Sequence, residues 1–181
     1  MTDLLVLDLV EKRLVTDQIT LTVGYDIENL TDPEISRKYK GAVSNDMYGR
    51  KFPKHAHGTA NLKTRTSSTR LIIEAVMALF DRIVDENLLV RRVNMSANRV
   101  VDESTAKRPD THEQRDLFTD SEAVQRQEKE QEAALERERR TQEAVLSIRK
   151  KLGKNMILKD MNLEDGATAQ DKNRQIGGHK A

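Results

Sequence analysis

The sequence predicts an α+β fold, a split βαβ-like domain that lacks its first strand and places two helices on one face of an antiparallel-mixed sheet. Three segments alternate apolar and polar residues with the period of a strand, and two segments repeat apolar residues at helical spacing. Their order is helix, strand, strand, helix, strand. A connector, a long charged helix and a polar tail follow.

The helices are expected over residues 2–14 and 66–85, the second with hydroxyl side chains at its start. The strands are expected over residues 18–25, 59–65 and 89–98. Residues 26–58 read as a long loop marked by glycine and proline. Each strand has one apolar side and each helix one apolar stripe, so both helices can cover one sheet face while the other face meets solvent.

Four regions follow from the changes in composition. Residues 1–101 form the packed domain, 102–120 a flexible connector, 121–152 a charged helix and 153–181 the tail. The helix clusters its apolar residues only toward its end, which favours a solvated helix with i,i+4 ion pairs over a coiled-coil seam. A dimerising adaptor with a small scaffold domain is the alternative function that this helix suggests.

Composition excludes several classes of protein. With no cysteine, the chain has no disulfide, thiolate metal site or cysteine nucleophile. No apolar run is long enough to span a membrane, and the first residues do not resemble an export signal, so we expect a cytoplasmic protein without a membrane partner. The formal charge of +1 does not by itself indicate a polyanion partner.

Charge is nevertheless segregated. The residues expected on the open sheet face include no acid, although 30 of the 181 residues are Asp or Glu. They are Gln18, Thr20, Thr22, Thr59, Asn61, Lys63, Arg65, Arg92, Asn94, Ser96 and Asn98. Residues 36–66 add further cations, including Arg50, Lys51 and Lys54, against the single acid Asp46. Short donors beside Lys and Arg suit phosphate oxygens, and the helix start at Thr66 and Ser67 adds backbone amides. A merely solvated face is the alternative.

Two further patterns concern partners and chemistry. His55 and His57 lie two residues apart beside basic residues, but no third ligand lies at useful spacing, so phosphate contact or a loop position is favoured over a metal site. A hydrolase using both histidines and Asp46 has little support. In the connector, Gln114, Leu117 and Phe118 match the pentapeptide with which bacterial polymerases and repair factors dock on the sliding clamp. Leu and Phe would fill an apolar pocket while Gln sets the register.

These residues together resemble a known family. The segments YGRKFP (48–53) and GTANL (58–62), the helix from residue 66, the strand with Arg91 and Arg92, and the tail from residue 154 resemble the C-terminal part of Y-family translesion DNA polymerases. The resemblance is to the UmuC-like, impB/mucB/samB branch found in Firmicutes. The matching region of that family is the little finger, a βαββαβ domain with both helices on one side.

The resemblance implies binding of template–primer DNA in DNA repair and SOS-type damage tolerance. Lys63, Arg65, Arg91 and Arg92 fall where the family contacts the DNA backbone, and Gln114, Leu117 and Phe118 where it binds the clamp. The family's palm, fingers and thumb, with the carboxylates that hold magnesium, have no counterpart here. We therefore expect a fragment or truncated reading frame without catalytic residues or cofactor of its own, which acts with the missing polymerase portion at the nucleoid.

Overall fold

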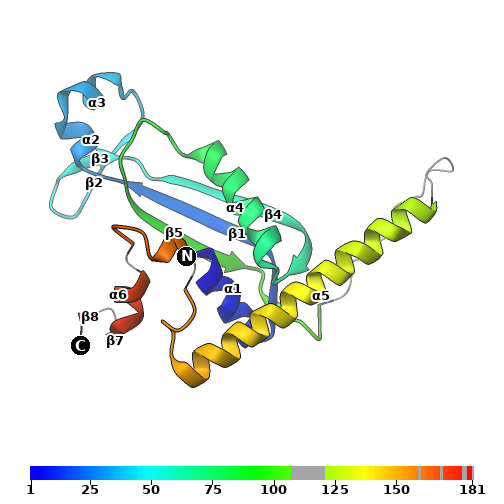
Figure 1. The fold of residues 1–181 in the computed structure, drawn as a ribbon. Helices are drawn as coiled ribbons and strands as arrows, with labels where there is room; N and C mark the ends of the chain where they lie inside the picture. Colours follow the sequence, from blue (N-terminus) through cyan, green and yellow to red (C-terminus); the bar gives the residue numbers. More distant parts are fainter. Residues whose placement is uncertain (107–120, 159, 168, 177–178, 181) are drawn as a thin grey trace. The chain divides into compact units, whose positions relative to one another are not determined.

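The computed structural model describes residues 1–106, 121–158, 160–167, 169–176 and 179–180. By its internal contacts the chain divides into two compact units, Met1–Arg115 and Asp116–Ala181. The first unit is built on an antiparallel sheet with the strand order β4-β1-β5, and a short β6 also pairs with β1 (Figure 1). The α+β class expected from the sequence is therefore confirmed.

The long strand β1 (Leu14–Tyr25) is the centre of this sheet. It pairs with β4 (Ala56–Thr66) on one side and with β5 (Val90–Asn98) on the other. Within the described part of the chain, the outer edges of β4 and β5 pair with no further strand. Both hydrogen-bonding edges of β1 are thus used, which makes it the most constrained strand of the domain.

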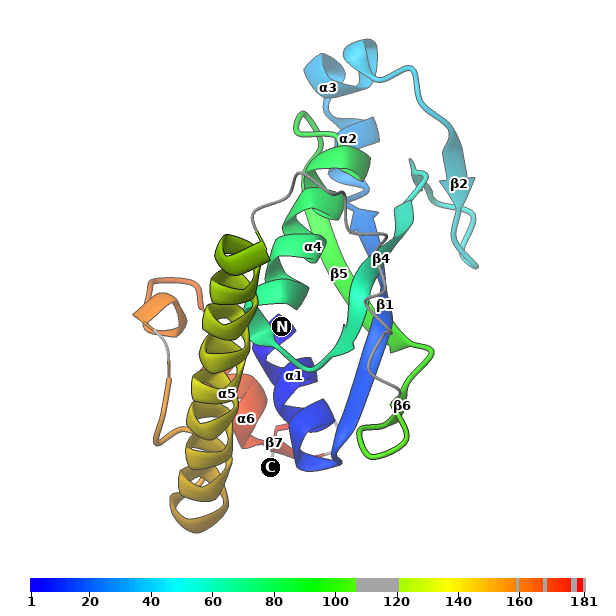
Figure 2. The same cartoon turned by 90° about the vertical axis from the view of Figure 1, so that its right-hand side faces the viewer.

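Two helices, α1 (Thr2–Glu11) and α4 (Thr69–Ile83), cover one face of the sheet, as expected (Figure 2). The core between them consists of side chains that share one side of each element. They are Val6, Leu9 and Val10 of α1, Ile19, Leu21, Val23 and Tyr25 of β1, and Ile72, Val76 and Leu79 of α4. Burial of each such side chain contributes on the order of 1.5–3 kcal/mol. The apolar side chains that recur every second residue in β1 and at helical spacing in α4 therefore pack together in one layer.

The helix α4 packs closely against β4 at Gly58. A Cβ atom added there would lie 2.9 Å from Leu79 Cδ1 and 3.0 Å from Ile83 Cγ2. Gly58 pairs with Leu21 of β1, so it lies on the covered face. Glycine is required at this position because α4 leaves no room for a side chain.

The expectation of a long loop over residues 26–58 is wrong. This segment contains α2 (Glu28–Thr31), α3 (Pro33–Lys38), β2 (Val43–Asn45) and β3 (Lys51–Pro53), and β2 and β3 form a hairpin. Asp32 caps α3 by accepting hydrogen bonds from the amides of Glu34 and Ile35. These elements have three to six residues, too few to produce a visible periodicity.

Element ends also differ from expectation. The helix α1 ends at Glu11. Arg13 adopts a left-handed backbone conformation with φ 54°, which stops the helix and turns the chain into β1. The helix α4 begins only at Thr69, with Ser68 as its N-cap. Beyond residue 101, Val101–Asp102 (β6) pairs with Val15 and Leu14, so the sheet extends into the region expected as connector.

The second unit contains the helix α5 (Ser121–Leu152) over the range expected. Two exposed ion pairs on α5 have the i,i+4 spacing: Arg139 Nε lies 3.2 Å from Glu143 Oε1, and Arg140 Nε lies 3.1 Å from Glu136 Oε1. The tail adds the 3-10 helix η1 (Asp160–Asn162), α6 (Ala169–Arg174), and the paired β7 (Gln175–Ile176) and β8 (His179–Lys180). No helix in the described ranges is long and apolar enough to cross a membrane.

The close approach at Gly58 gives a test of this packing. Gly58→Val should lower the free energy of unfolding by about 1–3 kcal/mol, because its side chain collides with Leu79 and Ile83. Urea denaturation followed by circular dichroism measures the change. Thr59→Val is the matched control, since Thr59 is the next residue on the same strand and lies on the opposite face. Equal stability of Gly58→Val and wild type would contradict the close contact.

Candidate nucleic-acid interface

The face of the sheet opposite α1 and α4 presents polar side chains in rows across three strands. The strand register aligns Asn61, Gln18 and Asn98 in one row, and Thr59, Thr20 and Ser96 in the next. A third row consists of His57, Thr22 and Asn94, and Arg92 follows opposite Gly24. The open face expected from alternation is therefore present, and the register places no acidic residue in these rows.

The side chains of these rows are linked by hydrogen bonds. Gln18 Nε2 donates to Asn61 Oδ1 at 2.9 Å, and the hydroxyls of Thr20 and Thr59 lie 3.3 Å apart. Asn98 Nδ2 donates to Thr20 Oγ1 at 2.6 Å, which crosses from one row to the next. The network orients amides and hydroxyls side by side along the surface. Such groups can donate to phosphate oxygens without a large change in rotamer.

His57 belongs to this face, although the sequence suggested a loop position for it. The strand β4 begins at Ala56 rather than residue 59, so His57 pairs with Thr22. Its Nδ1 lies 2.9 Å from Thr22 Oγ1. Extending the alternation of residues 59–65 backwards by two positions would have found it, but Gly58 reads as a loop signal in the sequence. Among the described residues, no cluster of three or more His, Asp or Glu could hold a metal ion.

The four cations expected on the sheet differ in their surroundings. Lys63 and Arg92 are exposed, and neither forms an ion pair with a described residue. Arg65, in contrast, has its Nε 3.4 Å from Asp17 Oδ2, and Arg91 has its Nη1 4.0 Å from Asp26 Oδ2. Lys63 and Arg92 therefore offer their full charge to a ligand, whereas Arg65 and Arg91 are partly neutralised.

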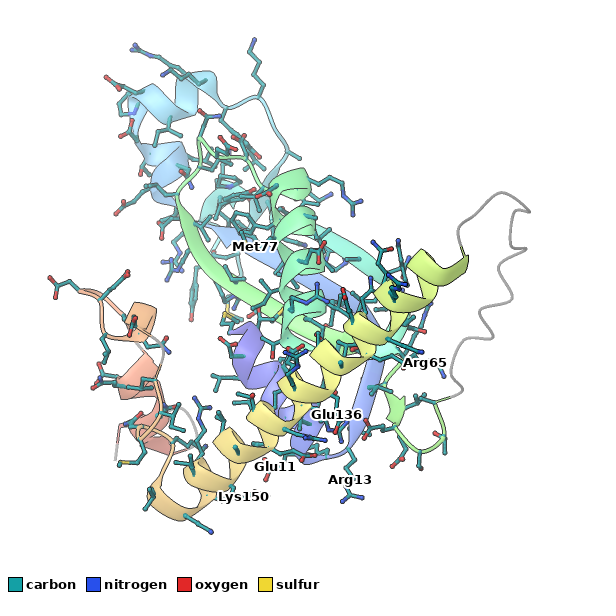
Figure 3. The ribbon with its side chains drawn as sticks, turned by 45° about the vertical axis from the view of Figure 1, so that its right-hand side comes forward. Glu11, Arg13, Arg65, Met77, Glu136 and Lys150 are labelled. Atoms are coloured by element: carbon teal, nitrogen blue, oxygen red, sulfur yellow. The ribbon has the colours of Figure 1, made fainter. Side chains whose placement is uncertain are left out.

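A β-bulge changes the end of the face that carries Lys63 and Arg65. The pairing of β1 with β4 shifts between Gln18–Asn61 and Thr16–Thr66. The fully buried Thr16 holds this irregularity, because its hydroxyl accepts from the Gln18 amide at 3.1 Å and also bonds to the Asn98 carbonyl. Figure 3 shows Arg65 near the end of β4 and Arg13 at the turn between α1 and β1. Lys63 and Arg65 thus lie beyond the regular rows.

The start of α4 offers less than the sequence suggested. Ser67 and Ser68 are buried, at 8% and 6% exposure. Thr66 Oγ1 accepts from the Ser68 amide at 3.0 Å, and Ser68 Oγ accepts from the Leu71 amide at 3.3 Å. Part of the hydrogen-bonding capacity at this helix start is therefore used within the protein.

Arg50, Lys51 and Lys54 lie on or beside the β2–β3 hairpin and are exposed. Arg50 Nε donates to Asp46 Oδ2 at 2.7 Å, and Asp46 Oδ1 accepts from the amides of Tyr48 and Arg50, both at 2.9 Å. Desolvation raises the pKa of Asp46, but the hydrogen bonds from Arg50 and Tyr48 outweigh it and keep this pKa below its ordinary value. Asp46 therefore remains ionised and holds the hairpin turn at neutral pH.

The clamp-motif residues Gln114, Leu117 and Phe118 lie outside the described residues.

Comparison with known proteins identifies the domain. Residues 1–117 match the family model described as the impB/mucB/samB family C-terminal domain. Searches of curated proteins and of solved structures found no match. Since the family match covers more than half of the chain, the protein belongs to the impB/mucB/samB family, and residues 1–117 are the little-finger domain of Y-family DNA polymerases, which binds DNA.

Proposed function

We propose that the open face of the β4-β1-β5 sheet binds the sugar-phosphate backbone of template–primer DNA at the nucleoid, in translesion synthesis and SOS-type tolerance of DNA damage. The observation that carries this proposal is the absence of acidic residues from three adjoining rows of side chains, which are amides and hydroxyls apart from the His57 imidazole. The family to which the domain belongs supports the same ligand. The resemblance of the tail supports the UmuC-like branch found in Firmicutes.

The chemistry of the face favours phosphate over bases. Amide and hydroxyl donors bind phosphate oxygens but do not stack on bases, and the rows contain no Phe, Tyr or Trp, with His57 at the edge of the third row as their one ring. Lys63 and Arg92 provide attraction that is independent of sequence, and Arg65 and Arg91 add less because acids lie beside them. The proposed binding is therefore non-specific and salt-dependent.

Further contacts are proposed around this face. Arg50, Lys51 and Lys54 extend the positive surface at the hairpin, and Thr66 and Ser67 are candidate phosphate contacts at the opposite end of β4. The metal-dependent chemistry of a polymerase does not fit the described residues, which contain no cluster of three or more His, Asp or Glu that could hold a metal ion. We assign magnesium to the palm of the polymerase, which would act together with this chain.

The second proposed partner is the bacterial sliding clamp. Its support is the sequence pattern at Gln114, Leu117 and Phe118, at the end of the DNA-binding domain and before a polar C-terminal unit. A short extended segment of this kind binds through one or two apolar anchors in a pocket. Clamp binding would keep the sheet face close to the primer terminus.

Replacing Lys63 or Arg92 by Ala tests the sheet face. Each variant should weaken binding to primed duplexes of different sequence by the same factor. Each should also reduce the slope of log K against log salt by about 0.9, the value of one lost phosphate contact. Fluorescence anisotropy between 50 and 200 mM salt measures both effects.

Lys12→Ala is the matched control, because it removes the same charge from the end of α1, on the covered side of the sheet. The control should retain the wild-type salt slope. If both sheet variants bind with unchanged affinity and slope, the assignment of the open face is wrong.

Replacing Leu117 and Phe118 by Ala tests the clamp motif. Each truncation should weaken binding to a bacterial sliding clamp about 30-fold or more, as expected for an anchor worth about 2 kcal/mol. Arg115→Ala and Asp116→Ala, at the variable positions of the same motif, should bind as wild type. Surface plasmon resonance measures the four affinities. Persistent binding by the Leu117 and Phe118 variants would eliminate this motif as the docking segment.

A further inference from the structure

The β2–β3 hairpin carries an exposed aromatic ring on an ordered turn. Residues 46–50, here called the hairpin tip, are closed by the Asp46 amide, which donates to the Arg50 carbonyl at 3.0 Å. The Gly49 amide donates to the Asp46 carbonyl at 3.0 Å, and Gly49 has a positive φ of 76°. Together with the bonds to the Asp46 carboxylate, these contacts give the tip one defined conformation.

Two side chains on this tip are exposed to solvent and not packed against the domain. Tyr48 is 76% exposed and Met47 is 89% exposed. The guanidinium carbon of Arg50 lies 5.3 Å from the centre of the Tyr48 ring, and its Nε is held by Asp46. A flat ring and a flat cation are therefore held together at the surface.

The charges around the tip indicate an anionic ligand. Lys40, Lys51 and Lys54 are exposed and form no ion pair with a described residue. The only acid between residues 36 and 66 is Asp46, and its carboxylate is occupied by Arg50 and two amides. An aromatic ring and an Arg surrounded by lysines are the groups with which proteins hold single-stranded nucleic acid, by stacking on bases and attracting phosphates.

The position of the hairpin fits this ligand. The strand β3 ends at Pro53, only three residues before β4 begins at Ala56. The neighbouring end of the sheet carries Arg92 and His57 on the open face. The hairpin projects from this end, away from the side of the sheet that α4 covers (Figure 2). A single-stranded DNA extension that leaves the open face at this end would pass on the side of the sheet from which the hairpin projects.

We propose that Tyr48, with the Arg50 guanidinium over its ring, is a stacking platform for an unpaired base in a single-stranded extension of the DNA that the sheet face binds. The proposal deepens the proposed function and rests on it for the duplex part of the ligand. Stacking on a ring tolerates any base, so this contact adds preference for single-stranded structure rather than for sequence.

The substitution Tyr48→Trp provides a direct test, because the chain contains no Trp. The Tyr48→Trp variant of the full chain is titrated with a single-stranded oligonucleotide, a primer–template with a single-stranded extension, and a blunt duplex. Stacking should quench the fluorescence with the first two ligands. The blunt duplex should bind without quenching the fluorescence, and fluorescence anisotropy measures that binding. Equal quenching by all three ligands, or none with the single strand, would overturn the proposal.

Two substitutions distinguish the contribution of the aromatic ring from that of an apolar side chain in general. Tyr48→Phe should bind the extended primer–template as wild type, while Tyr48→Leu should bind it roughly 5- to 150-fold more weakly, the range for one lost base stack. Tyr48→Leu should retain the wild-type salt slope and affinity for blunt duplex. If Tyr48→Leu binds all ligands as wild type while Lys63→Ala binds weakly, the platform is wrong and the sheet face stands. If the wild-type chain binds no duplex, the proposed function itself fails.

Discussion

The pairing of β1 on both of its edges is the constraint on which the rest of the domain depends. With β4 and β5 aligned to one central strand, the two-residue period of β1 determines which face each residue of all three strands occupies. Ile19, Leu21 and Val23 then require the apolar stripes of α1 and α4 above them. A shift of one residue would bury Thr20 and Thr22 and expose this core, so the register is strongly specified.

The same constraint produces the binding face. Residues that cannot enter the core are placed next to one another at the spacing of neighbouring strands, about 4.8 Å. Their hydrogen bonds to each other satisfy part of their polar capacity and reduce their freedom. The surface is thus pre-organised before a ligand arrives, which lowers the entropy that binding must overcome. Lys63 and Arg92 add positive charge at the two ends of this surface and not in its middle.

The sequence was sufficient to predict what long periodic segments determine. The alternation of residues 18–25 predicted the two faces of β1, and the apolar spacing of Ile72, Val76 and Leu79 predicted α4. The hairpin was missed because each of its strands has three residues. The place of His57 on β4 was missed because the strand was expected to begin only after Gly58, whereas Gly58 belongs to the strand and packs closely against α4.

Contacts between residues distant in sequence could not be predicted at all. The bulge at Thr16 shifts the register of β4, and the resulting proximity of Asp17 to Arg65 joins residues 48 positions apart. No local pattern reports such a pair. The ion pairs that distinguish Arg65 and Arg91 from Lys63 and Arg92 could therefore not be predicted from the sequence.

Methyl NMR of the full chain with primer–template DNA tests the central claim most directly, because the two faces of β1 provide their own control. The methyl groups of Thr20, Thr22 and Thr59 should shift or broaden when DNA is added. Those of Ile19 and Leu21, on the covered face of the same strand, should change little. Bound DNA with unperturbed threonine methyls would contradict binding at the open face.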